Sequence, residues 1–135
     1  MTETHRISAL TQAFERHQID AARFHHAEHV RVAVDLLRKY DFVDAVSIYA
    51  KGVRSIAAQA GAPEKVNLTI TYAFISLIAE RLSRSPWAGW EAFADAHPDL
   101  LRKQALQAWY SEERLHSDIA RRMFLLPDRS GHPAV

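Results

Sequence analysis

Hydrophobic residues recur along most of the chain at intervals of three and four. In the segment 25–40 they form one stripe made of Val30, Ala33, Val34 and Leu37. This spacing places side chains on one face of an α-helix. Similar periodicity covers 7–17, 42–60 and 63–85, and none of these segments shows the strict alternation of a half-buried strand. The pattern therefore predicts an all-α protein.

Residues with strong positional preferences mark the ends of these helices. Asp41 is a good N-cap for the helix 42–60, and Gly61 can adopt the left-handed conformation that often ends a helix. Pro63 is suited to the first turn of the next helix. Because almost no chain separates 25–40 from 42–60, we predict a tight antiparallel or sharply angled pair.

The segment 63–85 is the most apolar of the predicted helices. It contains the longest run without a charged residue, 66–79, which polar residues such as Asn67 and Ser76 interrupt. A membrane span needs about 20 mostly apolar residues. We therefore interpret 63–85 as a central buried helix and predict no membrane association.

Shorter helices are predicted over 87–96, 99–109 and 112–123, with Ser111 as the cap of the last. A single domain over 1–135 follows, folded as a compact bundle of about five to seven helices whose core is 25–40, 42–60 and 63–85. Residues 1–20 are expected to form an N-terminal helix or arm, and 128–135 a flexible tail.

Composition narrows the classes of function. The 17 basic and 16 acidic residues leave no excess of positive charge for nucleic-acid phosphates. Cysteine is absent, which excludes disulfides and thiolate chemistry, and we expect a cytoplasmic protein. A net charge close to zero gives little repulsion between copies, which favours self-association as a homodimer.

The densest chemical feature is a histidine cluster at the start of the segment 25–40, formed by His25, His26 and His29. Spacings of three and four residues place two imidazoles on neighbouring turns of a helix. Neutral imidazole is a common metal ligand and general base. A helix N-terminus and mutual repulsion both disfavour protonated rings. The cluster therefore predicts metal ligands or bases, and its structural alternative is rings that cap the helix or face water.

A second candidate set is polar. Glu64, Asn67 and Thr71 follow a spacing of three and then four, which predicts one face of the helix 63–85. If this face meets the histidines, its oxygens could contact a small-molecule ligand or complete a site for zinc, iron, manganese or nickel. The structural alternative is that Thr71 bonds back to its own helix and Glu64 is a favourable acid in the first turn.

Several motifs carry a resemblance to a known family. They are the stretch Phe24-His25-His26 followed by His29, the triplet Thr69-Ile70-Thr71 within 61–71, and the stretch 109–115. Over about 24–128 the chain resembles a small uncharacterised family of bacterial all-helical proteins. In sequences of that family, a histidine and a glutamate often precede the triplet, where this chain has Asn67 and Leu68. The resemblance implies a helical fold and draws attention to this region, and it implies no particular reaction.

Two functions follow as hypotheses. The first is a small-molecule or metal-binding protein, or an enzyme, with a histidine-rich pocket between the helices 25–40 and 63–85. The second is a non-catalytic homodimeric interaction module that buries aromatic surface from its C-terminal half.

Overall fold

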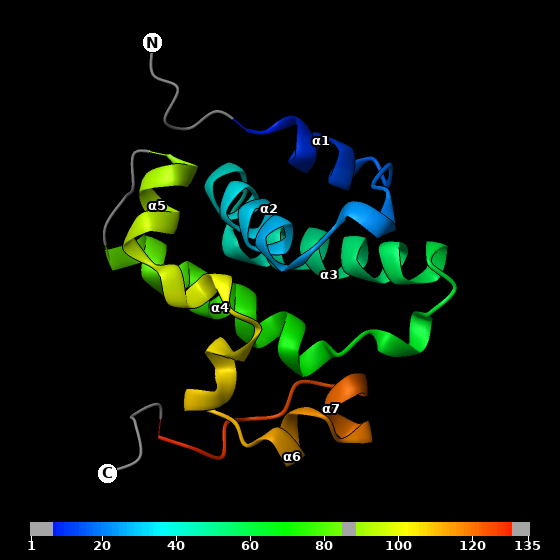
Figure 1. The fold of residues 1–135 in the computed structure, drawn as a ribbon, viewed down its shortest axis with the longest axis vertical. Helices are drawn as coiled ribbons and strands as arrows, with labels where there is room; N and C mark the ends of the chain where they lie inside the picture. The colour runs from blue at the N-terminus through cyan, green and yellow to red at the C-terminus, as the bar shows by residue number, and fades with distance from the viewer. Residues whose placement is uncertain (1–6, 85–88, 131–135) are drawn as a thin grey trace.

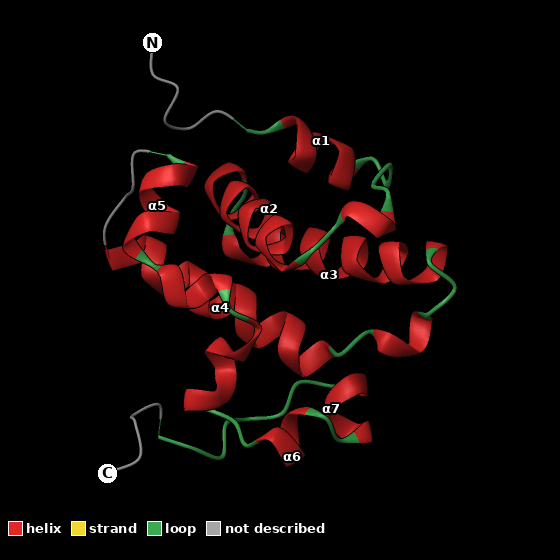
Figure 2. Cartoon of the chain, in the orientation of Figure 1, coloured by secondary structure: helices red, strands yellow, loops and turns green. Residues whose placement is uncertain are grey.

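The computed structural model describes residues 7–84 and 89–130. In this part of the chain every regular element is helical, and no strand occurs (Figure 2). The α-helices are α1 (Ala9–Glu15), α2 (His26–Lys39), α3 (Phe42–Gln59), α4 (Leu68–Arg84), α5 (Trp90–Ala96), α6 (Glu112–Leu115) and α7 (Asp118–Arg122). Four 3₁₀ segments are η1 (Ala21–Arg23), η2 (Pro63–Lys65), η3 (Pro98–Leu101) and η4 (Lys103–Ala108). The prediction of an all-α bundle is confirmed.

The core is formed by α2, α3 and α4, as predicted. In Figure 1, α2 is seen nearly end-on while α3 runs across the view behind it, so their axes cross steeply. The turn between them is short because Asp41 caps α3 at once, accepting a hydrogen bond from the backbone N–H of Asp44 at 2.8 Å. At the other end of α3, Gly61 adopts the left-handed conformation that ends the helix, with a φ of +73°. The predicted caps of α3 are therefore confirmed.

A buried carboxylate attaches α1 to this core. Asp35 of α2 is 3% exposed and accepts a hydrogen bond from the hydroxyl of Thr11 at 2.7 Å. It also accepts from the backbone N–H and the hydroxyl of Ser8, at 3.1 and 2.8 Å. Because Ser8 is the N-cap of α1, these three bonds fix the start of α1 against α2 and satisfy the buried charge.

The prediction that a helix begins at Pro63 is wrong. Pro63 opens the short segment η2, and Val66 follows in an extended conformation with ψ of 135°. The α4 helix begins only at Leu68, because the side chain of Asn67 accepts a hydrogen bond from the N–H of Ile70 at 3.0 Å and acts as its cap. Glu64 therefore lies before α4 and not on it.

The predicted helices in the C-terminal third are also shorter than the pattern indicated. The segment 99–109 is two 3₁₀ segments separated by Arg102, which has an extended ψ of 137°. The segment 112–123 breaks into α6 and α7 because the hydroxyl of Ser117 accepts a hydrogen bond from the N–H of Ala120 at 3.2 Å and caps a new helix. Trp87, the predicted start of another helix, lies outside the described residues, and α5 begins at Trp90.

The C-terminal elements α6 and α7 lie beside the start of α4, on the side away from α3 (Figure 1). The hydroxyl of buried Thr69 donates to the carbonyl of Met123 at 2.7 Å and accepts from the N–H of Leu125 at 3.0 Å. Asp128 begins the predicted tail, and its carboxylate accepts two hydrogen bonds from Ser111. These contacts hold the segment 123–128 against α4 and the start of α6.

Within the described residues, no helix combines the length and apolar character needed to cross a bilayer.

Candidate functional site

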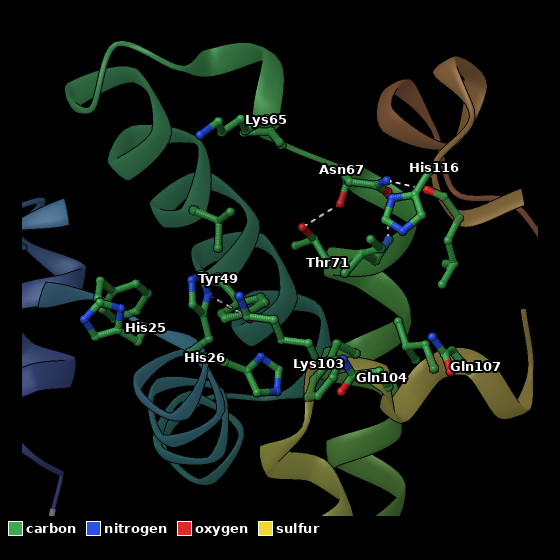
Figure 3. A pocket seen from close by; sticks show the side chains of 18 of the residues that line it. His25, His26, Tyr49, Lys65, Asn67, Thr71, Lys103, Gln104, Gln107 and His116 are labelled. Atoms are coloured by element: carbon green, nitrogen blue, oxygen red, sulfur yellow. Dashed lines mark hydrogen bonds between the residues drawn. The ribbon is translucent and has the colours of Figure 1, made fainter. Parts of the chain in front are cut away.

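A cleft of about 600 Å³ opens between the start of α2, the middle of α3, the start of α4, η4 and α6. We call it the α2–α4 cleft (Figure 3). Its walls are largely apolar. They come from these elements and from the residues just before α2. The main apolar residues are Phe24, Val53, Ile70, Phe74, Leu106 and Leu115.

The three clustered histidines all line this cleft, yet each occupies a different environment. His25 is the N-cap residue of α2, and its imidazole is exposed. Its backbone N–H donates to the carboxylate of Glu28 at 2.8 Å, which is half of a capping box. The side chain of His25 therefore stands at the rim of the cleft.

His26 and His29 lie deeper. The Nε2 of His26 is 3.0 Å from the carbonyl of Leu100, so this nitrogen must carry the proton because a carbonyl only accepts. The same ring meets Phe74 edge-on, with 4.9 Å between ring centroids. His29 packs against Phe24, with 4.3 Å between ring centroids. Thus His26 joins α2 to η3, and His29 forms part of the cleft floor.

Burial keeps both of these imidazoles neutral. Desolvation, and to a smaller extent the nearby His26, lower the pKa of His29 to about 4, although Glu28 acts in the opposite direction. Burial also lowers the pKa of His26. The sequence predicted neutral rings from the helix N-terminus and from mutual repulsion. Repulsion contributes to the low pKa of His29, and burial is the larger cause.

Tyr49 completes the floor and was not predicted. Its hydroxyl lies 3.5 Å from the Nδ1 of His29, and the residue is only 4% exposed. Burial raises the pKa of Tyr49, so the phenol stays protonated at neutral pH. The helical spacing of Ala45, Val46 and Tyr49 indicates a buried face of α3, but spacing does not show that a histidine of another helix meets it.

The predicted polar face does not form as expected. Asn67 and Thr71 line the cleft, whereas Glu64 is exposed and does not line it. The amide of Asn67 donates to the carbonyl of Leu115 at 2.6 Å, and the hydroxyl of Thr71 donates to the carbonyl of Asn67 at 2.8 Å. The alternative reading, in which Thr71 bonds to its own helix, is confirmed. These two side chains therefore mainly shape the wall.

The metal site predicted at the histidine cluster stays a prediction, because the cluster alone does not supply a full set of ligands. Within the described part of the chain, no three His, Asp or Glu side chains are grouped so that they could hold a metal ion. His25 is exposed, and the Nε2 of His26 is directed to a backbone carbonyl. The donors present thus do not fit zinc, iron, manganese or nickel, each of which requires further ligands.

The opposite rim is formed by residues that sequence reasoning did not select. Lys103 and Gln104 come from η4, and Glu112 and His116 from α6 and its end. All four are exposed. Figure 3 shows Lys103 extending from η4 into the opening, towards the side formed by the start of α2 and Tyr49. No local pattern marks these residues, because only the packing of η4 and α6 beside α4 brings them to the histidines.

No family model, curated protein or solved structure matches this chain. The function is therefore inferred from the chemistry of the cleft and not from relatives.

Proposed function

We propose that this protein binds a small organic molecule in the α2–α4 cleft. The observation that carries the proposal is the cleft itself, which has a volume of about 600 Å³ and mostly apolar walls. Small-molecule sites are typically clefts of about 300–1,000 Å³ with a few well-placed polar groups. Such a cleft lets an apolar ligand body leave water while a small number of polar groups fix its orientation.

The pair His29 and Tyr49 is the polar recognition point of the proposed site. Both groups are neutral at pH 7, because burial lowers the pKa of His29 to about 4 and raises the pKa of Tyr49. Their 3.5 Å separation is long for a hydrogen bond, so either group can exchange this contact for one to a ligand at little cost. A neutral His29 can also accept a hydrogen bond from a bound molecule.

NMR binding measurements with a set of neutral aromatic and aliphatic fragments, observed both on the fragments and on the imidazole signals of the protein, test the proposal. We expect binding that shifts the imidazole signals of His29 and is lost in Gln104→Trp, which places an indole from the exposed rim into the cleft. Gln12→Trp is the matched control, because Gln12 is equally exposed but lies on α1. Fragments that bind the parent protein and Gln104→Trp equally well would place binding elsewhere and reject the proposal.

A second candidate function is self-association. Three large apolar side chains, Phe42, Val43 and Phe124, are 49%, 74% and 46% exposed, and they line a second groove of about 370 Å³. Of the aromatic residues in the C-terminal half, Phe124 belongs to this surface, whereas Phe93 and Tyr110 lie in the core. A homodimer formed through this groove should appear in sedimentation equilibrium and dissociate in Val43→Asp. A monomeric parent protein would exclude it.

A further inference from the structure

The cleft combines apolar walls with a lysine, Lys103, at its rim. Lys103 extends from η4 into the opening (Figure 3), and its charge acts on the nearby His26, whose pKa it lowers further beyond the effect of burial. Within the described residues, the ammonium group of Lys103 has no hydrogen-bond or ion-pair partner. A cation in this position can pair with the negatively charged end of a bound molecule.

The remaining charges of the cleft favour an anion over a cation. Among the described residues that line it, Glu112 is the one acid, and one of its carboxylate oxygens accepts a hydrogen bond from Gln107 at 3.0 Å. Lys65, at the end of η2, adds a second positive charge at the far end of the cleft. A ligand with a positive end would thus meet two lysines against a single carboxylate, which is unfavourable.

We propose that the α2–α4 cleft binds an organic carboxylate, with an apolar body against Phe74, Ile70 and Leu106 and its charged end at Lys103. This inference rests on the proposed function and specifies its ligand class. A single carboxylate charge suits this arrangement better than a phosphate, because no arginine of the described residues lines the cleft and arginine forks provide the bidentate contacts that phosphate groups favour.

Isothermal titration with two matched probe sets tests the ligand class. The sets are 4-phenylbutyrate with its amide and its amine analogue, and octanoate with octanamide and octylammonium. We expect each carboxylate to bind about two- to fivefold more tightly than its amide, the range typical of one exposed ion pair. The amines should bind more weakly than the amides. Octyl phosphate should bind no more tightly than octanoate.

Two variants link this preference to Lys103. Lys103→Met keeps most of the alkyl chain and removes the charge, so the difference between carboxylate and amide should vanish while amide binding persists. Lys51→Met is the control, because Lys51 is an exposed lysine of α3 that does not line the cleft, and it should keep the full preference.

The outcomes separate this inference from the proposed function. Equal affinity for carboxylate and amide in the parent protein, or a preference that survives Lys103→Met, would overturn the carboxylate proposal and leave small-molecule binding intact. Tighter binding of octyl phosphate would overturn the choice of carboxylate. If none of the probes binds and no neutral fragment binds the cleft either, both proposals fail together.

Discussion

The phenyl ring of Phe14 lies directly against the Cα of Gly52. A Cβ atom built on Gly52 would overlap with three carbons of that ring, and Phe14 itself is 1% exposed. The missing side chain on α3 therefore creates the space into which α1 inserts its largest residue. Together with Asp35, which bonds the start of α1, this contact fixes α1 on the pair formed by α2 and α3.

Gly52→Ala should therefore destabilise the protein although alanine is the better helix former. The added methyl group forces the Phe14 ring to move, and overpacking of this kind costs about 1–3 kcal/mol, more than the gain of about 1 kcal/mol from helix propensity. Urea unfolding of the variant measures the difference.

A double-mutant cycle with Phe14→Leu supplies the control. The smaller side chain leaves room for the new methyl group, so the cost of Gly52→Ala should be smaller in the Phe14→Leu background. An unchanged cost in that background would show that the destabilisation arises elsewhere on α3.

Asn67 holds the wall of the cleft through two separate hydrogen bonds. Its side-chain oxygen caps α4 at Ile70, and its amide donates to the carbonyl of Leu115. Asn67→Ala removes both and should cost about 2–3 kcal/mol, from about 1 for a lost cap and about 1–2 for the carbonyl left without its donor. Equilibrium unfolding in urea gives this value.

Asn67→Ser separates the two contributions. Serine caps helices about as well as asparagine, but its short side chain cannot reach Leu115. The serine variant should therefore lose only the second contribution and fall between the parent protein and Asn67→Ala. A serine variant as unstable as the alanine variant would contradict the assignment of the cap.

The helical class and the three core helices could be predicted because their signals are local. Periodic apolar residues mark α2, α3 and α4, and the caps at Asp41 and Gly61 act within a few residues. The start of α4 was misplaced because Pro63 and the acid after it imitate a first turn, whereas the actual cap, Asn67, is also held by the distant Leu115. Tertiary contacts decide which of two possible helix starts forms, and they are not visible in the local sequence.

The candidate site was predictable only in part, from the histidines of α2 and from Asn67 and Thr71 at the start of α4. The motif at His25, His26 and His29 identified the start of α2, since clustered imidazoles are visible in the sequence. Tyr49 and Lys103 face this cluster from α3 and η4, and nothing in their own neighbourhoods indicates that they do so. The depth of His29, which determines its low pKa, likewise follows from packing and not from spacing.

Acid should destabilise the protein through His29. Its pKa in the folded protein is lowered to about 4, against about 6.5 in an unfolded chain. The unfolded state thus binds more protons between these values, so the stabilisation is complete above about pH 6.5 and is lost as the pH falls towards 4. Between pH 7 and about 4.5 the loss should be about 2–3 kcal/mol, at 1.36 kcal/mol for each pH unit. Urea unfolding at a series of pH values measures it.

His29→Gln should make this pH dependence shallower, because glutamine does not titrate. Half-buried His26, whose pKa is also lowered, contributes in the same direction and keeps some slope in the variant. Val53→Ala is the control, since it removes apolar contacts in the same cleft and should lower stability equally at every pH. A His29→Gln profile as steep as that of Val53→Ala would show that His29 is not the main titrating group.

The protein should bind no divalent metal tightly at the histidine cluster. Two imidazoles on neighbouring turns provide too few donors for a stable zinc site, which needs at least three protein ligands, and the described residues offer no third carboxylate or imidazole beside His26 and His29. Elemental analysis of untagged protein, incubated with zinc and then desalted, should therefore give much less than one equivalent. His26→Ala and His29→Ala should give the same value as the parent protein. One equivalent of zinc that is lost in both variants would instead establish a metal site and require a ligand from outside the described residues.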